Sequence, residues 1–148
     1  MDARNFIKIG MSAERTLVVP AERTVGHFVP GMPLVYATPM MILEMEMASS
    51  DAIRPYLQPG WITVGTEVDI RHLGASLVGA TVRVTGKVIS VERRVIRFEV
   101  EAFEGERRIG DGRHAREEMP DRALDRHHQR PLGAHADLDE VARVHGMP

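Results

Sequence analysis

Two polar residues flank the middle of the chain at positions where their side chains could do acyl-transfer chemistry. Thr38 precedes Pro39 at the start of an apolar segment, and this pair predicts a helix start with Thr38 as the N-cap. The free N–H groups and the dipole at such an end can hold a thioester oxyanion. His72 ends a β-rich run before a Gly/Ala/Ser loop, where it could exchange protons with a substrate. Taken singly, each residue also has a non-catalytic interpretation: Thr38 as an ordinary N-cap and His72 as a solvated histidine.

Two carboxylates, Glu44 and Glu46, are the only charges in the apolar segment 33–48. Positions two apart lie about 200° apart around a helix, so the two cannot face one site. One is expected to reach solvent or an arginine, and the other to be buried. A buried carboxylate tends to have a raised pKa, which suits a general base or nucleophile near neutral pH. The alternative is that both lie at the helix rim, solvated or salt-bridged.

The elements that must position these residues follow from the hydrophobic period. An apolar helix is predicted from Thr38 to about 52–54, ending before Pro55. Strands are predicted at 16–19, 24–29, 61–72, 81–91, 95–103 and 106–116. Glu104-Gly105 predicts a tight hairpin before the last of them. Two short strands, one buried helix and an antiparallel meander indicate an α+β fold, in which a curved antiparallel sheet wraps the helix.

Composition narrows the functional classes. The 148 residues fit one domain, and a formal charge of −2 gives no basic field for nucleic acid. The absence of cysteine excludes a disulfide scaffold, a thiolate nucleophile and a cysteine-based zinc site. No apolar run approaches the roughly 18 residues that span a bilayer, and the N-terminus does not read as a secretory signal. We therefore expect a cytoplasmic protein without nucleic-acid or membrane partners.

An ordered set of residues adds a family resemblance. The set comprises Val18-Val19-Pro20, Thr24-Val25, His27, Ala37-Thr38, Met45-Glu46, Ala48, Pro55-Tyr56-Leu57, Pro59-Gly60, Gly65-Thr66, Val68, His72, Gly79, Thr81-Val82, Ile109-Gly110, Gly112, His114 and Arg116. The spacing Thr-x7-Glu, followed by a glycine and then a histidine seven residues later, is fairly specific in combination. Over residues 9–116 this order resembles the thioesterase family that contains fluoroacetyl-CoA thioesterase.

The resemblance implies a hotdog fold, a homodimer, possible assembly into a dimer of dimers, and an active site at the subunit interface. It implies hydrolysis of a small or medium acyl-CoA thioester, with Thr38, Glu46 and His72 as catalytic residues. Glu46 would be base or nucleophile, His72 would orient and exchange protons, and Thr38 would position the carbonyl or act as nucleophile. Gly65 would lie against the substrate and Arg116 near the CoA side. No cofactor or metal is expected, since CoA is part of the substrate. A non-catalytic acyl-CoA or ligand-binding hotdog protein is the alternative function.

Three departures from the family pattern lead to further expectations. The segment 28–37 is too short for the lid of the fluoroacetyl-specific enzyme, so selectivity for fluoroacetyl is not expected. Pro39 stands where that enzyme has a glycine, which removes one candidate oxyanion donor. After Arg116 the run from Glu117 to Pro120 is expected to end the strand. The chain is accordingly divided into a domain at 1–116 and an atypical tail at 117–148, whose four histidines are assigned no metal.

The spacing of Thr38 and Glu46 raises a geometric question. A helix that begins at Thr38 places Glu46 about 12 Å along its axis, too far for direct contact. Either the helix begins later, or substrate or water bridges the two residues. We expect Glu46→Gln to lower kcat and Glu44→Gln to do little.

Overall fold

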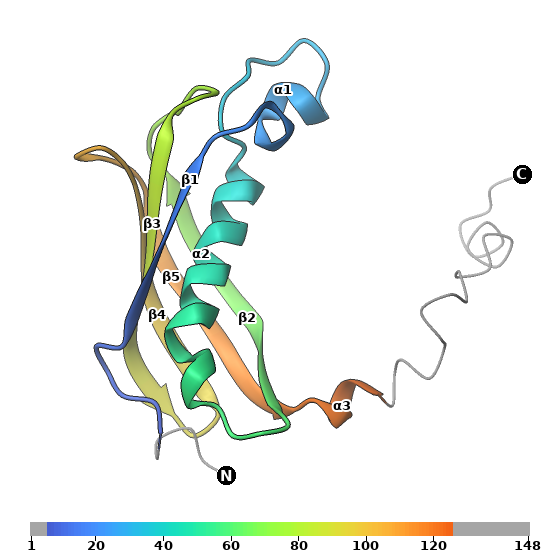
Figure 1. Ribbon diagram of the computed structural model, residues 1–148, viewed down its shortest axis with the longest axis vertical. Helices are drawn as coiled ribbons and strands as arrows, with labels where there is room; N and C mark the ends of the chain where they lie inside the picture. Colours follow the sequence, from blue (N-terminus) through green and yellow to red (C-terminus); the bar gives the residue numbers. More distant parts are fainter. Residues whose placement is uncertain (1–5, 126–148) are drawn as a thin grey trace, which may run out of the picture.

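Within residues 6–125, which the computed structural model describes, the alternating segments form one curved antiparallel sheet around one long helix (Figure 1). The main elements are β1 (Ser12–Val18), α2 (Thr38–Ile53), β2 (Trp61–His72), β3 (Thr81–Glu92), β4 (Val95–Glu104) and β5 (Arg107–Pro120). The short ones are η2 (Ala21–Arg23), α1 (Val25–Phe28), η3 (Arg54–Tyr56) and α3 (Arg122–Asp125). The strand order is β1-β3-β4-β5-β2, so β1 and β2 are the sheet edges.

The core lies between α2 and the concave face of the sheet. As predicted from the alternation in β4, every second side chain from Ile96 to Ala102 is fully buried, and those between them point outward. The helix contributes Met41, Met45, Ala48, Ala52 and Ile53 to the same core, which β3 completes with Val82, Val84 and Val88. The helix is not covered all round, however, because Leu43 is 41% exposed.

Two glycines let α2 lie directly on the strands. A Cβ at Gly86 of β3 would lie 2.8 Å from the backbone nitrogen of Ser49, and one at Gly110 of β5 would lie 2.6 Å from the sulfur of Met41. Real Cβ atoms do not approach neighbours this closely. The absence of a side chain at Gly86 and Gly110 therefore lets α2 approach the sheet closely at Ser49 and at Met41.

The segment predicted as a second N-terminal strand, 24–29, instead forms the short helix α1 directly after Thr24. Only Thr24 forms a bridge, to Tyr36. Its hydroxyl donates to the carbonyl oxygen of Ala21 at 2.7 Å. Such local side-chain bonds offer the backbone an alternative to strand pairing, which explains why the β-rich composition misled.

The last strand does not end at Arg116 as expected. β5 continues through Pro120, and its residues Glu117 to Pro120 pair with Val64 to Trp61 of β2. Pairing with β2 supports the whole stretch despite its charges, and Val95 of β4 pairs with Glu117 at its start. Pro120 is the final residue, where a missing N–H costs little. A boundary after Arg116 would cut a paired strand. The short helix α3 follows, and the rest of the tail, from residue 126 on, lies outside the described residues.

No helix in the described part of the chain combines the length and apolarity needed to cross a bilayer.

Candidate active site

The Thr38 hydroxyl lies 2.7 Å from Nδ1 of His72. Thr38 is the first residue of α2, and Ala37, in an extended conformation, is the N-cap. The prediction that Thr38 caps the helix is therefore wrong: its side chain bonds to the histidine instead of its own helix. A hydroxyl within hydrogen-bond distance of an imidazole is the arrangement of a nucleophile and its general base.

The chain before Thr38 is held by a short ladder of backbone bonds. Val25 N–H donates to the Val35 carbonyl at 2.9 Å, and Ala37 N–H donates to the Arg23 carbonyl at 3.0 Å. On the other side, Tyr36 N–H donates to the Ser76 carbonyl at 2.7 Å. These bonds fix the residue that enters α2 and so fix the position of Thr38.

His72 is the last residue of β2, and its ring is partly buried. Burial lowers the pKa of His72 below its ordinary value, while the backbone of Gly74 partly offsets this. The Nε2 atom is buried and no described residue gives it a hydrogen bond of good geometry. A lowered pKa keeps the imidazole neutral near pH 7, so Nδ1 can accept the Thr38 proton.

An open hollow of about 360 Å³ adjoins this pair. Its lining residues are Val25, Val35, Tyr36, Thr38, His72, Leu73, Gly74 and Ala75. Apart from the Thr38–His72 pair the lining side chains are mostly apolar, as an acyl-binding cavity requires.

Glu46 lies elsewhere, beside the middle of β2. A Cβ at Gly65 would lie 3.5 Å from Oε2 of Glu46, 3.1 Å from the ring of His114 and 3.8 Å from Nη1 of Arg116. The structure thus brings together Glu46, Gly65 and Arg116, and separately Thr38 and His72. Because α2 does begin at Thr38, Glu46 lies about 12 Å further along the axis and the two groups do not meet within one chain.

Arg116 is held beside Glu46 by Thr63 and His114. Its guanidinium donates to the Thr63 hydroxyl and carbonyl, both at 2.9 Å, and to Nε2 of His114 at 3.2 Å. Since arginine only donates, His114 Nε2 is the acceptor, and its Nδ1 donates to the Glu67 carbonyl at 2.9 Å. His114 is therefore neutral, in agreement with burial, the main cause that lowers its pKa.

Sequence reasoning did not assign roles to Thr63 and His114. The alternation of a strand could have indicated the role of His114, because His114 and Arg116 are two residues apart and so lie on the same face. Thr63 carried no such signal, since its contact with Arg116 depends on the pairing of β2 with β5.

Glu44 is the buried member of the acidic pair. Its carboxylate bonds to Nε of Arg15 at 2.8 Å and to Nη1 of Arg23 at 2.6 Å. Glu46 is only partly buried. One carboxylate was expected to reach solvent or an arginine and the other to be buried. Glu44 is the buried one and also bonds to two arginines, whereas Glu46 is partly open to solvent.

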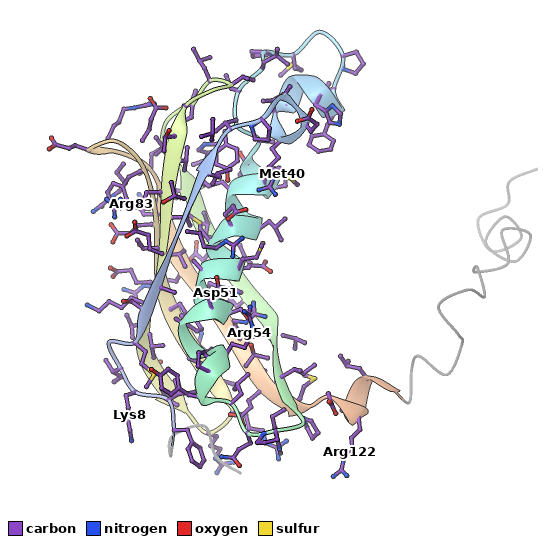
Figure 2. The ribbon with its side chains drawn as sticks, viewed as in Figure 1. Lys8, Met40, Asp51, Arg54, Arg83 and Arg122 are labelled. Atoms are coloured by element: carbon purple, nitrogen blue, oxygen red, sulfur yellow. The ribbon has the colours of Figure 1, made fainter. Side chains whose placement is uncertain are left out.

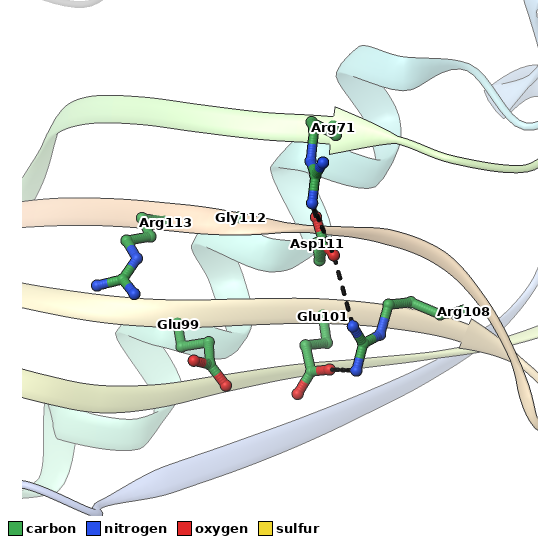
Figure 3. Close-up of a pocket in the computed structure, with 7 residues that line it drawn as sticks. All are labelled: Arg71, Glu99, Glu101, Arg108, Asp111, Gly112 and Arg113. Atoms are coloured by element: carbon green, nitrogen blue, oxygen red, sulfur yellow. Dashed lines mark hydrogen bonds and ion pairs between the residues drawn. The ribbon is translucent and has the colours of Figure 1, made fainter.

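A second hollow, of about 370 Å³, lies on the sheet face away from α2 (Figure 3). Its charged side chains largely neutralise one another: Arg71 pairs with Asp111, and Arg108 pairs with Glu101 and Asp111. Without a hydroxyl or imidazole among its lining residues, this hollow offers no counterpart to the Thr38–His72 pair.

Comparison with known proteins gives concordant matches. Residues 19–119 match the family described as fluoroacetyl-CoA-specific thioesterase. The fluoroacetyl-CoA thioesterase of Streptantibioticus cattleyicolor is 37% identical over 119 residues, which cover 76% of this chain and 86% of that protein. A solved structure of the fluoroacetyl-CoA thioesterase FlK superposes with a TM-score of 0.78 at 33% identity, covering 83% of this chain and 96% of the other.

Two further solved structures extend the comparison. A hypothetical protein of Thermus thermophilus, described as a thioesterase superfamily member, superposes with a TM-score of 0.77 at 32% identity, covering 93% of this chain and 97% of that one. A hot-dog-like protein from Thermanaerovibrio acidaminovorans superposes with a TM-score of 0.79 at 18% identity, covering 91% of this chain and 100% of that one, a likeness of fold alone. The predicted hotdog fold is thereby confirmed.

Proposed function

Because this chain belongs to the family of fluoroacetyl-CoA-specific thioesterases, an acyl-CoA thioesterase family, we propose that it hydrolyses small or medium acyl-CoA thioesters with Thr38, Glu46 and His72. The observation that carries this proposal is the 2.7 Å contact between the Thr38 hydroxyl and His72 Nδ1. It supplies a nucleophile and a base already in hydrogen-bond contact.

The reaction would proceed in two steps. In the first, Thr38 Oγ attacks the thioester carbonyl carbon while its proton passes to His72 Nδ1. The C–S bond then breaks, and the proton passes from His72 to the departing CoA sulfur. In the second, water attacks the ester on Thr38, a base takes the water proton, and Thr38 regains its hydrogen as the free acid leaves.

The oxyanion formed in each step requires donors near Thr38. Among the described residues no hydrogen bond is recorded for the Thr38 N–H, which begins α2 and is free to point at an oxyanion. Pro39 offers no second N–H, so a further donor would have to come from another element or from a second subunit.

Glu46 would serve the second step, as the base for water, but only if it reaches Thr38 from another chain. Both Leu43 of α2 and Val68 of the edge strand β2 are exposed, at 41% and 46%. An open sheet edge beside exposed apolar residues favours pairing with a second copy. We therefore propose a homodimer in which Glu46, Gly65 and Arg116 of one subunit complete the site around Thr38 and His72 of the other.

The hollow beside Thr38 would take the acyl group. Val25, Val35 and Leu73 provide apolar walls, and the hollow is open on one side. The segment from Phe28 to Ala37 is too short for the lid of the fluoroacetyl-specific enzyme, and its Tyr36 is buried in the core. We propose acyl groups of small or medium size without selectivity for fluoroacetyl, and a cytoplasmic location remains an expectation from the sequence.

The test is release of free thiol from a series of acyl-CoAs, followed by intact-protein mass spectrometry of Glu46→Gln. We expect hydrolysis by the wild type and accumulation of an acyl adduct on Thr38 in the variant. Tight binding of acyl-CoA without thiol release would instead identify a ligand-binding protein. An adduct on any other residue would remove Thr38 from the nucleophile role.

A complementation assay tests the composite site. Thr38→Ala and Glu46→Gln each inactivate both sites of their own dimers, but a mixed dimer would contain one site with both residues intact. We expect mixing and re-equilibration to restore about a quarter of wild-type activity if subunits exchange at random. No recovery, with mixed dimers shown to form, would place Thr38 and Glu46 of the same site in one chain.

A further inference from the structure

Glu44 is a buried charge with two arginine partners. Only 3% of the residue is exposed, and its two carboxylate oxygens bond separately to Arg15 and Arg23. A carboxylate buried in this way must be paired, because an unpaired one loses its hydration without compensation. The two ion pairs explain how a charge can be buried here. The other contacts of Arg15 and Arg23 differ, and they show what each ion pair connects to Glu44.

Arg15 leads away from the site. It lies on the edge strand β1, and its Nη1 also bonds to Asp51 at 2.9 Å. Asp51 in turn bonds to Arg54 at 2.8 Å, at the end of α2 (Figure 2). This branch ties β1 to the C-terminal half of the helix and contacts neither Thr38 nor His72.

Arg23 leads to the site. It is the last residue of η2, and its carbonyl oxygen accepts the N–H of Ala37 at 3.0 Å. Ala37 is the N-cap of α2 and is followed directly by Thr38. A closed circuit therefore runs from Glu44 through the Arg23 side chain and backbone to Ala37, and back along the helix to Glu44.

We propose that Glu44 is a positioning residue, which acts through Arg23 to hold the Thr38 hydroxyl against His72. It does not touch the substrate. The circuit passes through Ala37, directly before Thr38, and closes at Glu44 in the second turn of α2. Loss of the Glu44–Arg23 ion pair would therefore loosen the residue that enters the helix at Thr38. This role rests on the proposed function of Thr38 and His72, and it is separate from that of Glu46.

A matched pair of variants tests the proposal. Arg15→Met and Arg23→Met each remove one of the two ion pairs of Glu44. Arg15→Met also removes the pair with Asp51, so it should lower the thermal stability at least as much as Arg23→Met. We expect Arg23→Met to lower kcat about 10- to 100-fold, the scale of a small misplacement of a reacting group. We expect KM to change little, and Arg15→Met to keep kcat within about twofold of wild type. Arg23→Lys should restore part of the loss.

The second readout does not depend on turnover. In NMR titrations of the folded dimer, Arg23→Met should shift the His72 imidazole signals and their midpoint, because the Thr38 hydrogen bond is loosened, whereas Arg15→Met should leave both in place. Equal losses of kcat in the two variants, with equal NMR shifts, would reduce the network to a structural one and overturn the proposal. If the wild type hydrolyses no acyl-CoA, the proposed function fails, and the NMR comparison still decides whether Glu44 and Arg23 position Thr38.

Discussion

The Thr38 hydroxyl and His72 Nδ1 are 2.7 Å apart although the residues are separated by 34 positions in the chain. One begins α2 and the other ends β2, so the contact joins the helix to an edge of the sheet. Thr38 is exposed and His72 is partly buried, so the pair is accessible from solvent. Backbone hydrogen bonds of Tyr36, Ala37 and Leu73 hold the chain next to each of the two residues.

The first prediction concerns this pair. Thr38→Ala should lower kcat about 10²- to 10⁴-fold, the range for loss of a nucleophile–base partnership, and His72→Asn should do the same. Thr38→Ser retains the hydroxyl and should keep a measurable fraction of activity. Steady-state thiol release measures all three. Full activity in Thr38→Ala would show that the hydroxyl is not the nucleophile.

The second prediction separates the two acidic residues of α2. Glu46→Gln should lower kcat with little change in the melting temperature, because Glu46 is partly exposed and no ion pair is recorded for it among the described residues. Glu44→Gln should lower the free energy of unfolding by about 3 kcal/mol, because it leaves two arginines without their buried partner. Thiol release and a thermal melt check Glu46→Gln, and chemical denaturation checks Glu44→Gln. The sequence alone led us to expect little effect of Glu44→Gln on kcat, and the buried ion pairs add this expected loss of stability.

The third prediction concerns the pH dependence of activity. Burial lowers the pKa of His72, so the ring stays neutral to lower pH than an exposed histidine would. The acidic limb of kcat/KM should therefore have its midpoint below about 6.5, the ordinary histidine value. His27→Gln removes an exposed histidine that does not line the Thr38 hollow, so it is the control and should leave the limb in place. A midpoint above that value would contradict the assignment of His72 as the base.

The fourth prediction concerns stability against pH. His72 and His114 both have lowered pKa values in the folded chain, so below about 6.5 the unfolded chain binds protons that the folded chain does not. The free energy of unfolding should fall as the pH drops through this value and level off below the folded pKa values. Denaturation at a series of pH values measures the slope. In His114→Gln the slope should be smaller, and an unchanged slope would show that His114 does not contribute.

The fifth prediction concerns the end of the domain. Truncation after Arg116 removes four residues paired with β2, including the 3% exposed Glu118, and should cost more than about 2 kcal/mol of stability. Truncation after Asp125 leaves every described strand whole and should preserve folding and activity. Thermal melts of the two truncations provide the comparison. Similar melts would mean that the pairing of Glu117 to Pro120 adds little.

The sequence was informative where one local rule decided the outcome. Alternation alone placed Ile96 and Phe98 in the core, and Pro55 correctly marked the end of α2. It failed where tertiary contacts outweighed local preference. Thr38 prefers to cap a helix but bonds to His72, and β5 continues past Arg116 because β2 pairs with it.

For the candidate site too, some residues could be predicted from the sequence and others depend on tertiary contacts. The resemblance supplied Glu46, Gly65 and Arg116, which the structure groups together. The resemblance could not predict the ion pairs of Glu44 with Arg15 and Arg23, because these contacts join elements that are distant in sequence. Which of two neighbouring carboxylates is buried depends on how α2 is rotated against the sheet, and the spacing of the two residues does not fix that rotation.

The pairing of β2 with β5 has a consequence for the order in which the protein folds. The register that places Trp61 against Pro120 closes a loop containing all of β3 and β4. Contacts with such long closure are expected to form late, after the local β3–β4 hairpin. Substitutions in the Gly65–Arg116 region should then speed unfolding and leave the refolding rate nearly unchanged. The half-site around Glu46 would be the last part of the subunit to assemble, and the first to open.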